Sequence, residues 1–296
     1  MAQDQLSLPL TKDQAFALVD AVTQFEELAL SASAHEGKNG EWVFEATCDS
    51  PPDLTAFNAI ARKILGGKVT FRLERLDPDF DWVSKSLEGL KPVIAGGFFV
   101  YGSHEDAHIP AGATPLHIEA AQAFGTGHHE TTAGCLEAID RVLKRRKPNY
   151  VIDVGTGTGV LAIAIAKRTH LPVVASDIDP VAVNITIENA RLNEVAGKIR
   201  PVEAVGLEHP IIRQNAPYDL IVANILAAPL TALAPAIAQI AMPGATIILS
   251  GILVSQAARV IAAYGQQGIV LQQRITKAEW QTLIFEKRSA TTFSRG

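Results

Sequence analysis

The stretch of sequence that decides the fold is the run Val151-Ile152-Asp153-Val154-Gly155-Thr156-Gly157-Thr158-Gly159. Its opening apolar residues predict a short buried strand, and the apolar run at 160–168 that follows predicts a helix. Glycine in the turn between them permits positive φ and lets the backbone approach a ligand closely. A strand, a glycine-rich turn and a helix form the first half of a βαβ unit, so a parallel sheet is expected.

The spacing of the glycines distinguishes this turn from a nucleotide-phosphate motif. The dinucleotide fingerprint is G-x-G-x-x-G, and the position of its last glycine is Val160 here. Asp153, just before the turn, favours a ligand without phosphates. S-adenosylmethionine is such a ligand, because its cationic sulfonium, amine and carboxylate favour nearby acids and backbone dipoles. The alternative is an ordinary glycine-rich turn that binds nothing.

Strands and helices alternate from about residue 113 to the C-terminus, which predicts an α/β fold with helices on both faces of the sheet. The expected strands are 150–154, 172–176, 218–223 and 246–249, and the expected helices are 119–143, 160–168, 180–193, 229–240 and 255–264. The last two strands, 268–276 and 280–286, have no helix between them. They are therefore expected to form an antiparallel hairpin at one edge of a mostly parallel sheet.

The N-terminal part has a different pattern. It predicts strand, helix, strand, strand, helix and strand at 5–10, 11–22, 26–34, 42–48, 51–65 and 69–76. This order is the ferredoxin-like α+β arrangement. Residues 77–112, with a short helix at 79–87, are interpreted as a linker that also packs on the second domain. The expected domains are 1–76, the linker 77–112, and 113–296.

Composition excludes several classes of protein. The 296 residues are 48% hydrophobic and 19% charged, with a net charge of −5 from 31 acids and 26 bases. A wholly disordered chain is excluded, and the basic surplus of a protein that wraps nucleic acid is missing. Cys48 and Cys135 cannot form a disulfide framework or a four-cysteine zinc site. We expect both to be buried, and we expect no metal.

Targeting signals and membrane spans are not evident in the sequence. The first ten residues lack a basic region followed by an apolar one. The apolar segment 220–249 is interrupted by Asn224, three prolines and Gln239, whereas a membrane helix needs about 20 mostly unbroken apolar residues. The protein is expected to be soluble and cytoplasmic.

Two acids follow the next predicted strand. Asp177 stands 22 residues after Gly155, which is close to the spacing at which an acid meets ribose hydroxyls in βαβ nucleotide folds. A carboxylate can accept from both hydroxyls in strong, charge-assisted bonds. Asp179 precedes Pro180 and is interpreted as a helix cap.

Two further segments carry polar residues where a ligand is expected. Asn224 ends the strand at 218–223, and ligands of parallel sheets bind at the carboxyl ends of strands. The alternative is a turn asparagine that bonds its own backbone. The run 124–132, Phe-Gly-Thr-Gly-His-His-Glu-Thr-Thr, is interpreted as a loop that folds over a ligand. A metal is disfavoured, because His128 and His129 are adjacent and point in different directions.

Together, these segments resemble one family. Residues 125–132, 153–159, 177–180 and 224–226, with Leu249-Ser250-Gly251-Ile252-Leu253, look like the PrmA-type methyltransferases that modify the eleventh protein of the large ribosomal subunit. The resemblance covers most of the chain, including Asp81-Trp82 and a small N-terminal domain before a Rossmann-like class I methyltransferase domain. The family loop is usually G-T-G-x-H-P-T-T, and Glu130 replaces its proline here.

The resemblance implies a function and a set of contacts. Thr132, Gly155, Asp177 and Asn224 are the implied S-adenosylmethionine contacts, and Gly157 of the same turn is added to them. The implied reaction is methylation of lysine side chains and the N-terminal amine of a basic ribosomal protein. Residues 1–76 would dock this substrate. No catalytic base is assigned, and a monomer that binds neither nucleic acid nor membrane is expected.

Two other functions stay open on the sequence. A nucleic-acid or glutamine methyltransferase often carries N-P-P-Y or D-P-P-Y after the fourth strand, whereas this chain has Asn224-Ile225-Leu226-Ala227 without an aromatic residue. The basic run 144–147 could bind phosphate, but cations are also favourable at the end of a helix. A non-catalytic binding protein is the third reading, and it disagrees with the presence of every candidate contact.

Overall fold

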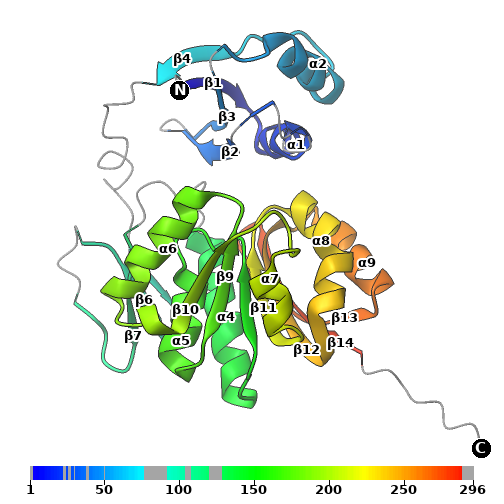
Figure 1. Cartoon of the computed structure of the whole chain (residues 1–296). Helices are drawn as coiled ribbons and strands as arrows, with labels where there is room; N and C mark the ends of the chain where they lie inside the picture. Colours follow the sequence, from blue (N-terminus) through cyan, green and yellow to red (C-terminus); the bar gives the residue numbers. More distant parts are fainter. Residues whose placement is uncertain are drawn as a thin grey trace, which may run out of the picture. The chain divides into compact units, whose positions relative to one another are not determined.

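The structure is a computed structural model that describes residues 3–22, 25, 28–29, 31–37, 40–49, 51–76, 92–103, 108–119 and 129–288. The described residues form two compact units, one made by residues up to 76 and one by residues from 92 onward (Figure 1). The helix expected at 79–87 and the loop residues 124–128 lie outside the described residues.

The N-terminal unit has the ferredoxin-like arrangement that the sequence predicts. Its elements are β1 (Gln3–Leu10), α1 (Lys12–Val22), β2 (Ser31–Glu36), β3 (Trp42–Asp49), α2 (Leu54–Leu65) and β4 (Arg72–Leu76). The antiparallel sheet has the order β2-β3-β1-β4. Asp53 caps α2 by accepting from the backbone N–H groups of Thr55 and Ala56, and Gly66 ends it in the left-handed conformation.

The predicted boundaries in this unit differ from the structure by two residues at the start of β1, by three at the start of β4, and most at β2. The second strand was expected at 26–34, but β2 begins at Ser31 and extends to Glu36. Pairing with β3 decides its position, because Ala34 lies opposite Phe44 and both side chains are buried. The interstrand register therefore outweighs the local apolar pattern.

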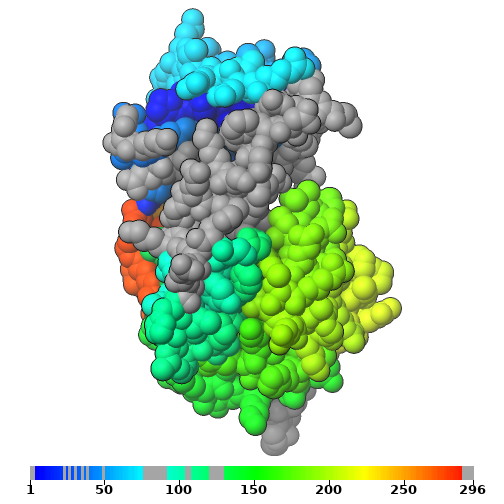
Figure 2. Space-filling model, turned by 90° about the vertical axis from the view of Figure 1, so that its left-hand side faces the viewer, coloured from blue at the N-terminus to red at the C-terminus, as the bar shows by residue number. Residues whose placement is uncertain are grey.

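A small sheet opens the second unit. It comprises β5 (Val93–Ala95), β6 (Phe98–Tyr101) and β7 (Thr114–His117), with β6 antiparallel to β5 and parallel to β7. Ala95, Phe98 and Leu116 are buried in the same core as helix residues of this unit. Figure 2 shows the blue-green atoms of the small sheet lying against the green atoms of the unit. Residues 93–101, which were assigned to the linker, thus pack on the second domain as expected.

The main sheet of this unit has seven strands in the order β10-β9-β8-β11-β12-β14-β13. They are β8 (Val151–Val154), β9 (Val173–Asp177), β10 (Ile199–Glu203), β11 (Tyr218–Asn224), β12 (Ala241–Leu253), β13 (Ile269–Lys277) and β14 (Trp280–Lys287). The first five strands in this order are parallel to one another, and β14 runs antiparallel to both β12 and β13. The predicted C-terminal hairpin is confirmed, with β14 inside the sheet and β13 at its edge.

Helices cover both faces of this sheet (Figure 1). One core contains residues of α4 (His129–Arg145), α5 (Val160–Thr169) and α6 (Pro180–Leu192). The other contains residues of α7 (Pro210–Asn215), α8 (Ala227–Ile240) and α9 (Ala257–Gln266). A short 3₁₀ helix, η2 (Ala196–Lys198), precedes β10. Successive residues of β8 enter opposite cores, Val151 the first and Ile152 the second, as strand geometry requires.

The predicted α/β fold is thus a three-layer unit whose central strands are buried on both faces. Within the described ranges, every helix is too short or too polar to cross a lipid bilayer.

Candidate functional site

The glycine turn connects the carboxyl end of β8 to α5. Gly155, Gly157 and Gly159 all have positive φ, at 68°, 56° and 81°. The backbone N–H groups of Gly155 and Thr156 donate to the carbonyl of Ser176 in β9, over 2.8 and 3.0 Å. The turn is therefore fixed against the neighbouring strand, in a conformation that glycine adopts at least cost.

Asp177 ends β9 beside this turn. Its Oδ2 accepts from the backbone N–H of Gly157 over 2.8 Å, and its Oδ1 accepts from the N–H of Asp179 over 3.1 Å. The side chain is half-buried, and each carboxylate oxygen has a further lone pair to offer. Asp179 caps α6 by accepting from the N–H of Val181 over 2.8 Å, which confirms its predicted role.

Asp153 lies beneath the turn and is fully buried. Its Oδ2 accepts from the hydroxyl of Thr156 over 2.8 Å and from the N–H of Ala162 over 3.1 Å. Its Oδ1 has no hydrogen-bond partner among the described residues. Burial, which disfavours the charged form, raises the pKa of Asp153 from 3.8 to about 7, despite the opposing hydrogen bonds from Thr156 and Ala162.

Asn224 ends β11, next to the turn, because the preceding pair Ala223 and Val154 are aligned between β11 and β8. The structure gives the Asn224 amide no hydrogen bond to the described residues, so its donor and acceptor are both available there. Ile225, the next residue, fills the space beside two glycines. A Cβ on Gly155 would lie 2.3 Å from its Cγ2, and one on Gly251 would lie 2.3 Å from its carbonyl oxygen.

The first turn of α4 is joined to the same edge of the sheet by hydrogen bonds with residues of β12 and β14. Ser250 is aligned with Asn224, donates to the carbonyl of Thr131 over 3.2 Å and shares a 2.8 Å hydrogen bond with Thr282. Thr132 is buried in this turn, directly after Thr131. Glu130 is exposed in the first turn of α4, where a negative charge interacts favourably with the helix dipole.

The structure therefore gathers the predicted site residues at one edge of the sheet. Gly155, Gly157 and Asp177 lie side by side in the turn and at the end of β9. Asn224 ends the adjacent strand β11. Thr132 lies next to Thr131, whose carbonyl accepts from Ser250. Residues 125–128 of the same predicted loop lie outside the described residues. The described part of the chain holds no group of three or more His, Cys, Asp or Glu that could bind a metal ion, and both cysteines are buried and outside any disulfide.

Sequence reasoning missed two apolar residues at this edge. Ile178 and Val205 are 57% and 70% exposed, and they follow the ends of β9 and β10. The two strand ends are joined, because the N–H of Ala204 donates to the carbonyl of Asp177 over 2.8 Å. Exposed apolar side chains beside a carboxylate suit the face of a flat base next to a sugar. The signal in the sequence was the apolar residue between two acids, Asp177 and Asp179.

Sequence reasoning also missed polar residues on the buried face of α6. Thr186 donates to the carbonyl of Gly157 over 2.9 Å, and Asn189 donates to the carbonyl of Thr158 over 2.9 Å. Both side chains are completely buried. The sequence contained a signal for these two residues. They lie on the same helix face as the buried Ala182 and Ala190, where apolar residues are expected.

The observed groups fit S-adenosylmethionine. The turn brings glycine backbone to the ligand side, Asp177 offers acceptors for two hydroxyls, and Ile178 and Val205 offer apolar surface.

Comparison with known proteins agrees with this geometry. Residues 14–288 match the family model described as ribosomal protein L11 methyltransferase (PrmA). Curated relatives named ribosomal protein L11 methyltransferase include one from Chelativorans sp. (strain BNC1), 46% identical over 91% of this chain and 93% of the relative. Another, from Mesorhizobium japonicum, is 44% identical over 96% of this chain and 99% of the relative.

A solved structure is also similar. The crystal structure of ribosomal protein L11 methylase from Lactobacillus delbrueckii subsp. bulgaricus matches with a TM-score of 0.59 and 28% identity, over 65% of this chain and 96% of that one. The family match and the relatives span nearly the whole sequence. This chain belongs to the ribosomal protein L11 methyltransferase (PrmA) family.

Proposed function

We propose that this protein transfers methyl groups from S-adenosylmethionine to lysine side chains and the N-terminal α-amine of ribosomal protein L11. The observation that carries the proposal is the family match over residues 14–288 together with a ligand-type site at the strand ends. The relatives that carry the name of this activity align with both parts of the chain.

Five residues are proposed to hold the cofactor: Thr132, Gly155, Gly157, Asp177 and Asn224. Asp177 would accept from the ribose hydroxyls with lone pairs that its two backbone contacts leave free. Gly155 and Gly157 would let the turn adopt positive φ at least cost, so that its backbone can approach the ligand. When bound, the cofactor supplies a methyl group activated by its attachment to a sulfonium, so that no covalent enzyme intermediate is needed.

The task of the protein is then to align the acceptor amine and to keep it neutral. An ordinary lysine has a pKa of about 10.4, so its proton must leave before the nitrogen can act as a nucleophile. The amide of Asn224 has no partner among the described residues, and its oxygen can accept from an amine N–H. We propose that Asn224 orients the amine, and we assign no catalytic base. Alignment is the larger part of the expected rate enhancement.

The N-terminal unit is proposed to dock the substrate. One face of its sheet is covered by α1 and α2, where Leu6 and Phe44 are buried. The opposite face carries Gln5, Glu45 and Glu74, since Gln5 bonds Glu45 over 3.3 Å and is aligned with Glu74. It also carries Arg72, which lies 3.7 Å from Glu74. Acids on this face suit a basic ribosomal protein. Of the linker expected at 77–112, residues 93–101 belong to the core of the second unit, so only the segment before residue 92 is proposed to let the two units reorient.

A truncation tests the docking role, because the second unit has two hydrophobic cores of its own. Deleting residues 1–76 is expected to abolish methylation of L11 while S-adenosylmethionine binding, measured by calorimetry, is retained. Full methylation by the truncated protein would refute the docking role.

The structure favours protein over nucleic acid as the substrate. In the basic run 144–147, Lys144 pairs with Asp140 over 2.7 Å, and Arg146 donates to the carbonyls of Gly244 and Asp219. These contacts use the cations for the fold and leave less of the run for phosphate. We further propose that the protein is a monomer and that it works in the cytoplasm, where ribosomes are assembled.

The experiment that tests the proposed function is mass spectrometry of ribosomal proteins from a strain that lacks this gene. The expected result is a set of missing methyl groups on L11 alone. Unchanged methylation of L11, or a loss on another protein or on RNA, would overturn the proposal. Calorimetry with the intact protein separates the non-catalytic reading, which expects no binding of S-adenosylmethionine.

A further inference from the structure

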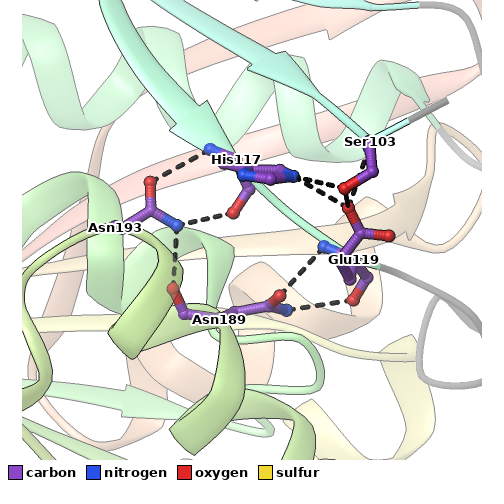
Figure 3. Close-up of polar contacts among 5 residues, drawn as sticks. All are labelled: Ser103, His117, Glu119, Asn189 and Asn193. Carbon is purple, nitrogen blue, oxygen red and sulfur yellow. Dashed lines mark hydrogen bonds and ion pairs between the residues drawn. The ribbon is translucent and has the colours of Figure 1, made fainter. Parts of the chain in front are cut away.

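Asn189 bonds two segments of the chain that are far apart in sequence, and Figure 3 shows its hydrogen bonds to the first of them, at Glu119. Its Oδ1 accepts from the backbone N–H of Glu119 over 2.9 Å. Its Nδ2 donates to the carbonyl of Glu119 over 3.1 Å and to the carbonyl of Thr158 over 2.9 Å. The side chain is completely buried, so each of these backbone groups depends on it for a partner.

Asn193, one turn further along the chain, provides a natural comparison. Its Oδ1 accepts from the backbone N–H of His117 over 3.0 Å, and its Nδ2 donates to the carbonyls of His117 and Asn189, over 2.5 and 2.9 Å. It is 3% exposed. The two asparagines thus hold residues 117–119 in the same way, but among the described residues Asn193 makes no hydrogen bond to the glycine turn.

Residues 117–119 are also held from their other side. Oε1 of Glu119 accepts from the backbone N–H of Ser103 over 2.8 Å and lies 2.8 Å from Nε2 of His117. The His117 ring stacks on Tyr101 with centroids 5.1 Å apart. Although partial burial opposes it, the hydrogen bonds from Ser103 and His117 lower the pKa of Glu119. The segment that Asn189 contacts is therefore a fixed support.

On the opposite side of Asn189, the glycine turn depends on α6. The carbonyl of Thr158 accepts from Asn189, and the carbonyl of Gly157 accepts from Thr186. The N–H of Gly157 in turn donates to Asp177. Glycine residues give this turn wide conformational freedom, so buried side-chain donors are needed to hold one conformation.

We infer that Asn189 is a positioning residue for cofactor binding, which fixes the Gly155–Gly159 turn against residues 117–119 and so directs the N–H of Gly157 to Asp177. The inference deepens the proposed function and rests on its assignment of the turn to S-adenosylmethionine. Asn193 also holds residues 117–119, and its other hydrogen bonds, to the carbonyl of Asn189 and from Nζ of Lys167, do not reach the glycine turn, so it serves as the matched control.

The test compares Asn189→Ala with Asn193→Ala by urea unfolding, amide hydrogen exchange and calorimetry with S-adenosylmethionine. Both variants are expected to lose stability, because each leaves buried backbone groups without partners. Without cofactor, the Gly157 amide should exchange at least about tenfold faster in Asn189→Ala and at the wild-type rate in Asn193→Ala. The affinity for S-adenosylmethionine should fall about tenfold or more in Asn189→Ala and less than about twofold in Asn193→Ala.

Equal exchange of the Gly157 amide in the two variants, or equal affinity, would overturn the inference. Wild-type protein that does not bind S-adenosylmethionine would contradict the proposed function, while amide exchange would still decide whether Asn189 positions the turn. If Asn189→Ala does not fold, Asn189→Asp takes its place, because it keeps the acceptor for Glu119. The affinity of Asn189→Asp for S-adenosylmethionine should rise as the pH is lowered, because a protonated carboxyl regains one hydrogen-bond donor. An affinity of this variant that does not change with pH would count against the inference.

Discussion

The backbone N–H of Gly157 donates to Oδ2 of Asp177 over 2.8 Å, which joins the turn after β8 to the end of β9. Twenty residues separate the two partners in the sequence. The contact orients the carboxylate at the carboxyl ends of the parallel strands, where open α/β sheets bind their ligands. Substitution of Asp177 tests this relationship directly.

Asp177→Ala is expected to weaken S-adenosylmethionine binding about 100-fold. Two hydrogen bonds to a charged group contribute about 1.5 kcal/mol each, and every 1.4 kcal/mol is about tenfold in affinity. Calorimetry measures the change. Asp179→Ala is the control, because it removes a helix cap worth about 1 kcal/mol of stability and leaves Asp177 in place. Equal affinity of the Asp177 variant and wild type would exclude the ribose assignment.

Gly251→Ala is expected to destabilise the fold by several kcal/mol, because its Cβ would lie 2.3 Å from the carbonyl oxygen of Ile225. Gly244→Ala is the matched control, since Gly244 has a similar φ of 78° but no atom within 4 Å of the added Cβ. The control should lose only the cost of a left-handed alanine, about 1–2 kcal/mol. Urea unfolding of both variants isolates the steric part, and equal losses would disprove it.

Arg168→Ala is expected to lower the free energy of unfolding by about 2–4 kcal/mol. Its guanidinium donates to the carbonyls of Gly96 and Gly97, to Thr114 and to Asp140, and it lies 4.3 Å above the Phe98 ring. These contacts hold the small β5–β7 sheet on the second unit.

The control for Arg168 is Arg141→Ala, which breaks a more exposed pair with Glu137. Exposed pairs contribute about 0–1 kcal/mol, so this variant should be nearly neutral. Thermal and urea unfolding measure both changes. A loss for Arg168→Ala no greater than that for Arg141→Ala would show that the small sheet does not depend on Arg168.

The buried Asp153 predicts a pH dependence of stability. Its pKa is raised to about 7 in the fold, whereas an unfolded aspartate titrates near pH 4. Between these values the unfolded chain is ionised and the folded one is protonated. The contribution of Asp153 to stability is therefore fully present below about pH 4 and is lost as the pH rises to about 7, by at most about 1.4 kcal/mol per pH unit.

Asp153→Asn provides the reference, because its amide does not titrate and its oxygen can accept the bonds from Thr156 and Ala162. The stability of wild type relative to this variant should fall between pH 4 and 7, as measured by urea unfolding at several pH values. A constant difference across this range would mean that Asp153 is not protonated in the fold.

The sequence was sufficient for the central strands and the glycine turn. β8 and β11 are buried on both faces and read as apolar runs, while the turn needs glycine at positive φ. Asp179 could be identified as a cap because it precedes Pro180. These features depend on residues that are close together in the sequence, so the local sequence is enough to predict them.

Sequence reasoning missed β10 and the three strands of the small sheet, and two of these four, β10 and β7, are edge strands with proline. β10 contains Pro201 and lies at one edge of the main sheet, and β7 contains Pro115 and lies at one edge of the small sheet. Proline is tolerated there because an edge strand has unpaired N–H groups. Their pairing depends on neighbours far along the chain, and the same is true of the contacts that Asn189 makes.

The central claim is tested most directly by incubating the purified protein with purified L11 and S-adenosylmethionine that carries a labelled methyl group. Mass spectrometry of the product should find labelled methyl groups on lysine side chains and on the N-terminal amine of L11, and Asp177→Ala should yield far fewer. L11 that stays unlabelled while the protein binds the cofactor would contradict the account.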